Sequence, residues 1–73
     1  MTEPIAIRDD MIHLDQLLKL AGVAGSGGQV RILVDDGLVR VNGEAESRRR
    51  RKLRVGDVIE VAGGSAYEVV RQP

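Results

Sequence analysis

The sequence predicts an α+β domain in which two short helices are followed by a small, mainly antiparallel β-sheet. Three observations lead to this fold class. Apolar residues recur at helical spacing before residue 36, they alternate with polar residues from residue 38 onwards, and glycine-rich turns separate the segments. Because the chain has 73 residues and no internal repeat, we expect one domain, 1–73, with a core over about residues 12–71.

The first helix is predicted by one apolar stripe. Residues 1–10 before it are mostly polar and are expected to form a tail or a short edge strand. The stripe repeats at i, i+3, i+4 and i+7 and consists of Leu14, Leu17, Leu18 and Ala21. We expect Gly22 to end the helix after about two turns. Asp15 lies four residues before Lys19, where an ion pair across one helical turn is expected.

The second helix is predicted to begin after a glycine-rich turn. Ser26 lies within Gly25-Ser26-Gly27-Gly28, and serine is a favoured N-cap residue. The apolar face that follows contains Val30, Leu33 and Val34. Asp36-Gly37 is expected to end this helix.

Strands are predicted in the second half of the chain. Val39 and Val41 alternate with a polar residue, and Asn42-Gly43 is a strong signal for a two-residue hairpin turn. Ala45 is expected on the returning strand. Two further strands are predicted at 58–61 and 66–70, each after a glycine-containing turn.

Composition excludes several kinds of chemistry. There is no cysteine and only one histidine, so no disulfide, metal or cofactor site is expected. The segment Gly22–Gly28 lacks the Gly-Lys-Ser/Thr ending of a phosphate-binding loop and the third glycine of a dinucleotide fingerprint. No nucleophile and base occur at a suggestive spacing, so we expect no enzyme. No apolar stretch has the roughly 20 residues of a membrane span, so a cytoplasmic protein without a membrane partner is expected.

The strongest functional signal is a run of cations. Formal net charge is zero, with 11 basic and 11 acidic residues. Six of the basic residues fall within seven positions: Arg48, Arg49, Arg50, Arg51, Lys52 and Arg54. This segment, at about +6, is offset by a remainder at about −6, and such a concentration of like charge favours a polyanionic partner. Because the run lies between two predicted strands, we expect an ordered loop, with Lys19 and Arg31 near the same edge.

The scarcity of aromatic residues limits the kind of nucleic acid that we expect this chain to bind. Tyr67 is the only aromatic side chain and is expected to pack on the sheet. Proteins that bind unpaired bases usually stack them on aromatic rings. Recognition of backbone and shape in structured RNA therefore fits this chain better than recognition of single strands.

The order of motifs resembles a known family. In chain order, the motifs are His13-Leu14-Asp15-Gln16-Leu17-Leu18-Lys19, Ser26, Arg31-Ile32-Leu33-Val34, Gly37-Leu38-Val39-Arg40-Val41-Asn42-Gly43 and Val55-Gly56-Asp57-Val58-Ile59. Together they are similar to the RNA-binding domain named after ribosomal small-subunit protein S-four, also called the αL motif. The likeness covers about Ile12 to Val61, and its most specific part is the order and spacing of the last two segments.

This resemblance implies two helices packed on a small bent sheet, with RNA held by the helix pair and the adjoining loop. Lys19 matches the basic residue late in the first helix, Ser26 the start of the second, and Arg31 the basic residue within it. Many members have arginine after that serine, whereas this chain has Gly27. One expected phosphate contact is therefore absent, and the richer arginine run is expected to compensate for it. The chain looks like the small standalone bacterial form.

The sequence therefore predicts a monomeric, non-catalytic RNA-binding protein. Ribosomal or transfer RNA, and the ribosome itself, are the partners that the resemblance implies, in translation or ribosome assembly. Two alternatives remain open at this point: an adaptor that docks an acidic protein through its arginines, and a non-specific nucleic-acid binder that also takes DNA.

Overall fold

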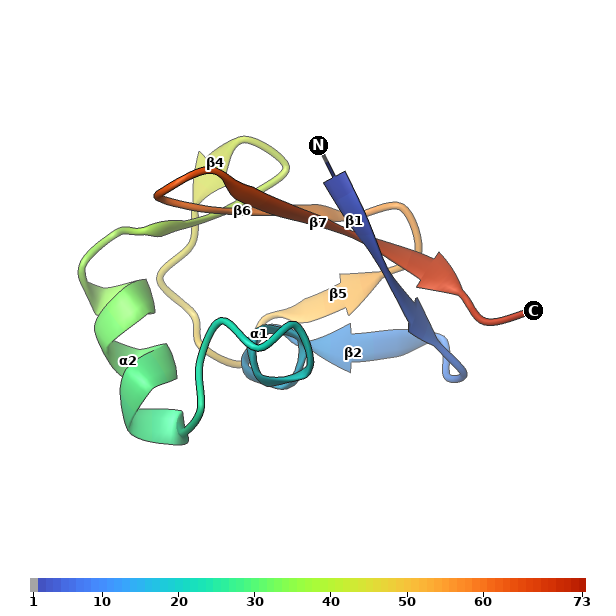
Figure 1. Ribbon diagram of the computed structural model, residues 1–73, viewed down its shortest axis with the longest axis horizontal. Helices are drawn as coiled ribbons and strands as arrows, with labels where there is room; N and C mark the ends of the chain where they lie inside the picture. Colours follow the sequence, from blue (N-terminus) through green and yellow to red (C-terminus); the bar gives the residue numbers. More distant parts are fainter. Residues whose placement is uncertain (1) are drawn as a thin grey trace.

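The computed structural model describes residues 2–73 (Figure 1). In chain order the elements are β1 (Thr2–Ile7), β2 (Met11–His13), α1 (Leu14–Leu20), α2 (Gly27–Asp35), β3 (Val39–Val41), β4 (Glu44–Ala45), β5 (Lys52–Arg54), β6 (Val58–Val61) and β7 (Ser65–Arg71). The α+β class with two helices and a mainly antiparallel sheet is confirmed. The expected order was incomplete, because β1 and β2 precede the helices.

Both helices end where glycine was expected to end them. After α1, the N–H of Gly22 donates to the carbonyl of Lys19 and that of Val23 to the carbonyl of Leu18. The same two bonds recur after α2, and both Gly22 (φ 77°) and Gly37 (φ 71°) adopt the left-handed conformation that this motif requires. These caps confine each helix to a few turns.

The main sheet has the strand order β1-β7-β6-β3-β4. Three of its pairings are antiparallel, and β1 pairs in parallel with β7 along its whole length, from Thr2 opposite Ala66 to Ile7 opposite Arg71. Of the two expectations for residues 1–10, the edge strand is therefore correct. The hairpin from β3 to β4 turns at Asn42 (φ 52°) and Gly43 (φ 87°), as predicted.

The hairpin turn is bonded to the turn before β6. The Asn42 amide nitrogen donates to Asp57 Oδ1 (3.1 Å), and Asn42 Oδ1 accepts from the N–H of Val58 (2.9 Å). Asp57 Oδ2 also accepts from the N–H of Arg54 at the end of β5 (2.8 Å). The two most specific segments of the family resemblance thus contact each other through side-chain hydrogen bonds.

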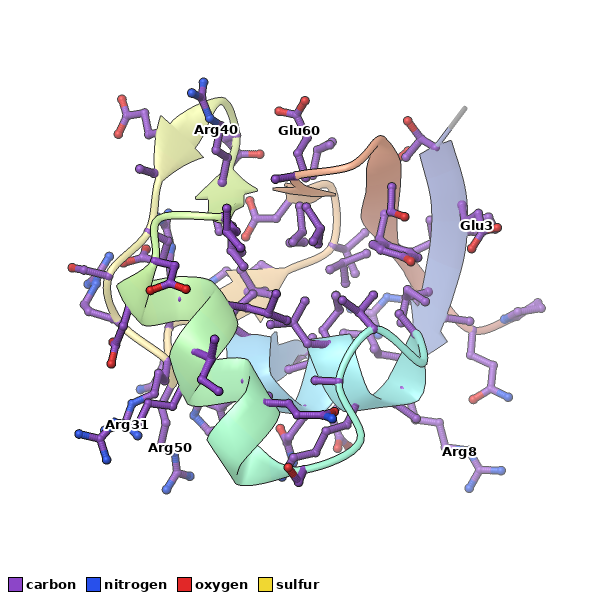
Figure 2. The ribbon with its side chains drawn as sticks, turned by 60° about the vertical axis from the view of Figure 1, so that its left-hand side comes forward. Glu3, Arg8, Arg31, Arg40, Arg50 and Glu60 are labelled. Atoms are coloured by element: carbon purple, nitrogen blue, oxygen red, sulfur yellow. The ribbon has the colours of Figure 1, made fainter. Side chains whose placement is uncertain are left out.

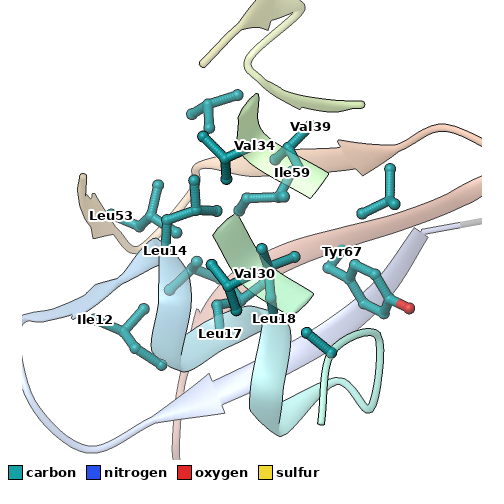
Figure 3. Close-up of a cluster of buried hydrophobic side chains, with 14 of the residues drawn as sticks. Ile12, Leu14, Leu17, Leu18, Val30, Val34, Val39, Leu53, Ile59 and Tyr67 are labelled. Atoms are coloured by element: carbon teal, nitrogen blue, oxygen red, sulfur yellow. The ribbon is translucent and has the colours of Figure 1, made fainter. Parts of the chain in front are cut away.

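A second, two-stranded sheet joins β2 to β5 in antiparallel register, with Ile12 opposite Leu53. Neither strand was predicted. Leu53 has no exposed surface and lies in one core with α1, α2 and the main sheet (Figure 3). That core is aliphatic apart from the buried Tyr67, which packs in it as expected. The second sheet is important because β5 is the end of the arginine run.

Among residues 2–73, neither helix approaches the length and apolar character needed to cross a membrane.

Candidate nucleic-acid interface

The arginine run has two kinds of structure. Residues 46–51 form a loop between β4 and β5, and the remaining cations belong to β5 itself. The carbonyl oxygens of Arg49 and Arg51 accept hydrogen bonds from the N–H groups of Asp15 (3.0 Å) and Leu14 (2.9 Å). The first N–H groups of a helix have no partner inside it, so the loop satisfies two that α1 would leave open. The loop is thereby fixed to the start of α1.

A buried carboxylate shapes the loop from inside. The Glu46 side chain is only 5% exposed and accepts from Arg48 Nε (3.1 Å), Arg48 Nη2 (3.2 Å) and Arg51 Nη1 (2.8 Å). It also accepts from the backbone N–H of Arg48 (2.9 Å). The sequence analysis assigned no role to Glu46, although its position two and five residues before these arginines was a usable signal. Two of the six cations are therefore engaged within the protein.

These contacts lower the pKa of Glu46 from 4.5 to about 2, chiefly through the Arg48 side-chain bonds, with burial acting in the opposite direction. The unfolded chain therefore binds more protons than the folded one between these values. We expect the Glu46 contribution to stability to be complete above about pH 4.5 and to be lost as pH falls toward 2. Urea unfolding at pH 6, 4 and 3 tests this. A Glu46→Gln variant that loses stability as steeply would contradict it.

A groove separates the loop from the second helix. It has a volume of about 480 Å³ and is lined by Asp15, Gly27, Val30, Ser47, Arg48, Arg49 and Arg50. Gly27 and Val30 come from the first turns of α2, so this wall begins where Ser26 caps the helix. Figure 2 shows Arg50 and Arg31 extending from the same side of the molecule, with Arg40 and Glu60 at the other end. The loop, the start of α1 and the start of α2 thus meet around one positively charged groove.

Strand geometry determines the direction in which the other two cations of the run point. Lys52 and Arg54 are exposed on β5, on either side of buried Leu53. Successive side chains of a strand point to opposite faces, so both lie on the outer face of the second sheet. The exposed members of the run that form no ion pair within residues 2–73 are therefore Arg49 and Arg50 at the groove and this pair on β5. We call these four residues the arginine surface.

The three residues expected from family resemblance have different surroundings. Ser26 is the N-cap of α2, and its Oγ accepts from the N–H of Gln29 (3.3 Å), so the hydroxyl is used inside the protein. Arg31 is exposed and forms an ion pair with Asp35 (3.5 Å) that solvent weakens. Lys19 is exposed in the last turn of α1, at the opposite end of that helix from the loop. The structure thus brings Arg31 to the side of the run.

The expected ion pair between Asp15 and Lys19 is not formed within residues 2–73. Instead Asp15 lines the groove, and its Oδ1 atom is buried without a hydrogen-bond partner in the described chain. The ion pair was predicted from the four-residue spacing of Asp15 and Lys19 in the helix. The loop packed on the start of α1 determines instead where the Asp15 side chain lies.

Comparison with known proteins gives a consistent result. The chain is 47% identical over 70 residues to a Bacillus subtilis protein named "Probable ribosome maturation protein RlbA", covering 96% of this chain and 99% of that one. It is 40% identical over 58 residues to YbcJ of Escherichia coli, covering 80% and 83% of the two chains. The solution structure of YbcJ, described as revealing an αL motif involved in RNA binding, matches with a TM-score of 0.67 and 35% identity. That match covers 94% of this chain and 85% of YbcJ.

A family model described as the S4 domain matches residues 5–70, which include both helices, the arginine run and nearly all of the main sheet. The two most specific segments of this resemblance are joined in the fold by the hydrogen bond between Asn42 and Asp57. On these grounds the chain belongs to the S4 domain family.

Proposed function

We propose that this protein is a non-catalytic RNA-binding module that holds structured RNA mainly through phosphate contacts. The arginine surface supplies the principal contacts, Arg31 extends it, and Lys19 adds a separate contact from the other end of α1. Arg48 and Arg51 contribute charge while their bonds to Glu46 keep the loop in shape. Ser26 acts by starting α2 beside the groove.

One observation carries this proposal: the arginine loop is bonded through its backbone to α1 and faces α2 across a groove. Cations on a fixed backbone lose less conformational entropy on binding than cations on a disordered arm. The missing aromatic residues support contacts to backbone and shape over base stacking. Such an arrangement fits a folded polyanion whose phosphates have fixed spacing.

The class of RNA is proposed from the relatives. The name of the Bacillus relative refers to ribosome maturation, and its identity extends over nearly all of this chain. We therefore propose ribosomal RNA in the cytoplasm as the first ligand to test and transfer RNA as the second.

The salt dependence of binding should report the number of phosphate contacts. If the four cations of the arginine surface each meet a phosphate, log affinity should fall against log salt with a slope of about −3 to −4. Raising salt from about 50 to about 200 mM should then weaken binding roughly a hundredfold. Fluorescence anisotropy with a labelled ribosomal RNA hairpin would measure this slope.

Competitors separate the proposal from the two alternatives. An unlabelled RNA hairpin should displace the probe far better than a DNA duplex of equal length or poly-glutamate. Equal competition by poly-glutamate would indicate an acidic protein partner. Equal competition by DNA would indicate a general nucleic-acid binder, and a flat salt titration would exclude phosphate contacts.

A further inference from the structure

One acidic residue lies in a groove otherwise lined by arginines and small or apolar residues. Asp15 belongs to the first turn of α1, and its backbone N–H is bonded to the Arg49 carbonyl (3.0 Å). Its side chain lines the groove together with Arg48, Arg49 and Arg50. A carboxylate at this point repels phosphate and accepts hydrogen bonds, so it favours a hydrogen-bond donor beside it.

The two oxygens of Asp15 differ. Oδ1 is buried and accepts no hydrogen bond from residues 2–73, so Oδ2 is the oxygen that a group in the groove can reach. None of the neighbouring arginines bonds to it, because Arg48 is held by Glu46 and the described contacts give Arg49 and Arg50 no side-chain bond to Asp15. The Asp15 carboxylate therefore has no ion-pair partner among residues 2–73, although three arginines line the same groove.

We propose that Asp15 makes the groove selective for RNA over DNA by accepting a hydrogen bond from a ribose 2′-hydroxyl. This inference rests on the proposed RNA-binding function and deepens it. The 2′-hydroxyl is the donor that lies nearest the phosphates along every RNA strand, and it is exposed in the wide minor groove of an RNA helix. With phosphates on Arg49 and Arg50, the adjoining sugar is the group presented to Asp15. A protein with no aromatic residue to stack bases can distinguish RNA through this contact.

The test uses one RNA hairpin made with ribose or with 2′-fluoro sugars. Both forms keep the geometry of an RNA helix and the same phosphates, but fluorine cannot donate a hydrogen bond. We expect the full-length protein to bind the ribose form about tenfold more tightly, the range of a hydrogen bond to a charged group. In Asp15→Ala the ratio should fall to about one, because only the ribose form loses a hydrogen bond. Loss of the negative charge should in addition raise affinity for both forms by the same factor. Asp15→Asn keeps an acceptor oxygen and should retain an intermediate ratio.

Glu60→Ala is the matched control, because it removes one negative charge from the end of the molecule far from Arg50 (Figure 2). It should leave the ratio unchanged. Circular dichroism checks folding, and Asp15→Leu, which is closer to aspartate in shape, replaces the alanine variant if that fails to fold. A wild-type protein that binds both hairpins equally, or an Asp15→Ala protein that keeps the tenfold ratio, would overturn the inference and leave RNA binding intact. Failure to bind either hairpin would instead overturn the proposed function.

Discussion

Replacing Arg49 and Arg50 by glutamate is expected to abolish measurable binding to a ribosomal RNA hairpin at physiological salt. Each substitution removes one phosphate contact and places a negative charge at the groove, so the salt slope should also become shallower by about 2. Both side chains are exposed, and the hydrogen bonds that fix the loop come from the Arg49 backbone and from Glu46. The circular dichroism spectrum and melting temperature should therefore change little. Anisotropy and thermal melts on the same samples measure both effects.

A control with the same change in charge is available in the chain. Arg8 and Arg40 are exposed, and Figure 2 shows both away from Arg50. Changing both to glutamate alters the net charge by the same four units, so a loss of binding that depended only on total charge would appear in both double variants. Equal losses would contradict a localised interface. Collapse of the fold in the Arg49/Arg50 variant would show that these side chains are structural.

Of the charged residues discussed above, Glu46 is expected to cause the largest loss of stability when replaced by alanine, about 2 kcal/mol. Removal of one partner of a buried ion pair usually costs more, but Arg48 is 70% exposed and Arg51 29%, so water compensates part of the loss. For a domain of this size the melting temperature should fall by roughly 10 °C. Glu44→Ala, an exposed change two residues earlier, should stay within about 0.5 kcal/mol of the parent.

The same variant separates loop geometry from charge. Glu46→Ala raises the net charge by one and frees two arginines, so charge alone predicts tighter RNA binding. We expect weaker binding, because the loop loses the contacts that orient it beside the groove. Anisotropy with the labelled RNA hairpin, measured below the melting temperature of the variant, shows whether binding becomes tighter or weaker. Tighter binding with an unchanged salt slope would show that the shape of the loop is unimportant.

Local signals in the sequence predicted the elements whose boundaries are set locally. The helix ends at Gly22 and Gly37, the cap at Ser26 and the turn at Asn42-Gly43 all depend on residues within a few positions of one another. Strand β5 was missed because its one buried residue, Leu53, is surrounded by cations that made the segment resemble a loop. Its partner β2 has three residues and lies about 40 positions earlier, so no local pattern connects the two.

The sequence likewise predicted only the part of the site that does not depend on how the chain folds. The exposed cations were evident from composition, since their charge is visible in the sequence alone. The sequence did not show which cations are engaged inside the protein. Glu46 binds Arg48 and Arg51 because the loop folds back on itself, whereas the described contacts give Arg49 and Arg50 no side-chain bond. The unpartnered oxygen of Asp15 likewise depends on packing between α1 and a loop more than 30 residues away. Residue-level contacts with RNA remain predictions.

The parallel pairing of β1 with β7 has a consequence for the order of folding. During synthesis, Thr2–Ile7 emerges before the other strands described above, yet its only neighbour in the sheet among residues 2–73 is Ser65–Arg71. The strand must therefore remain unpaired until Ser65–Arg71 has been made, because it pairs in the sheet with no earlier strand. Contacts between such distant residues slow folding. The hairpin and helices can form early, but completion of the sheet must wait for the last strand.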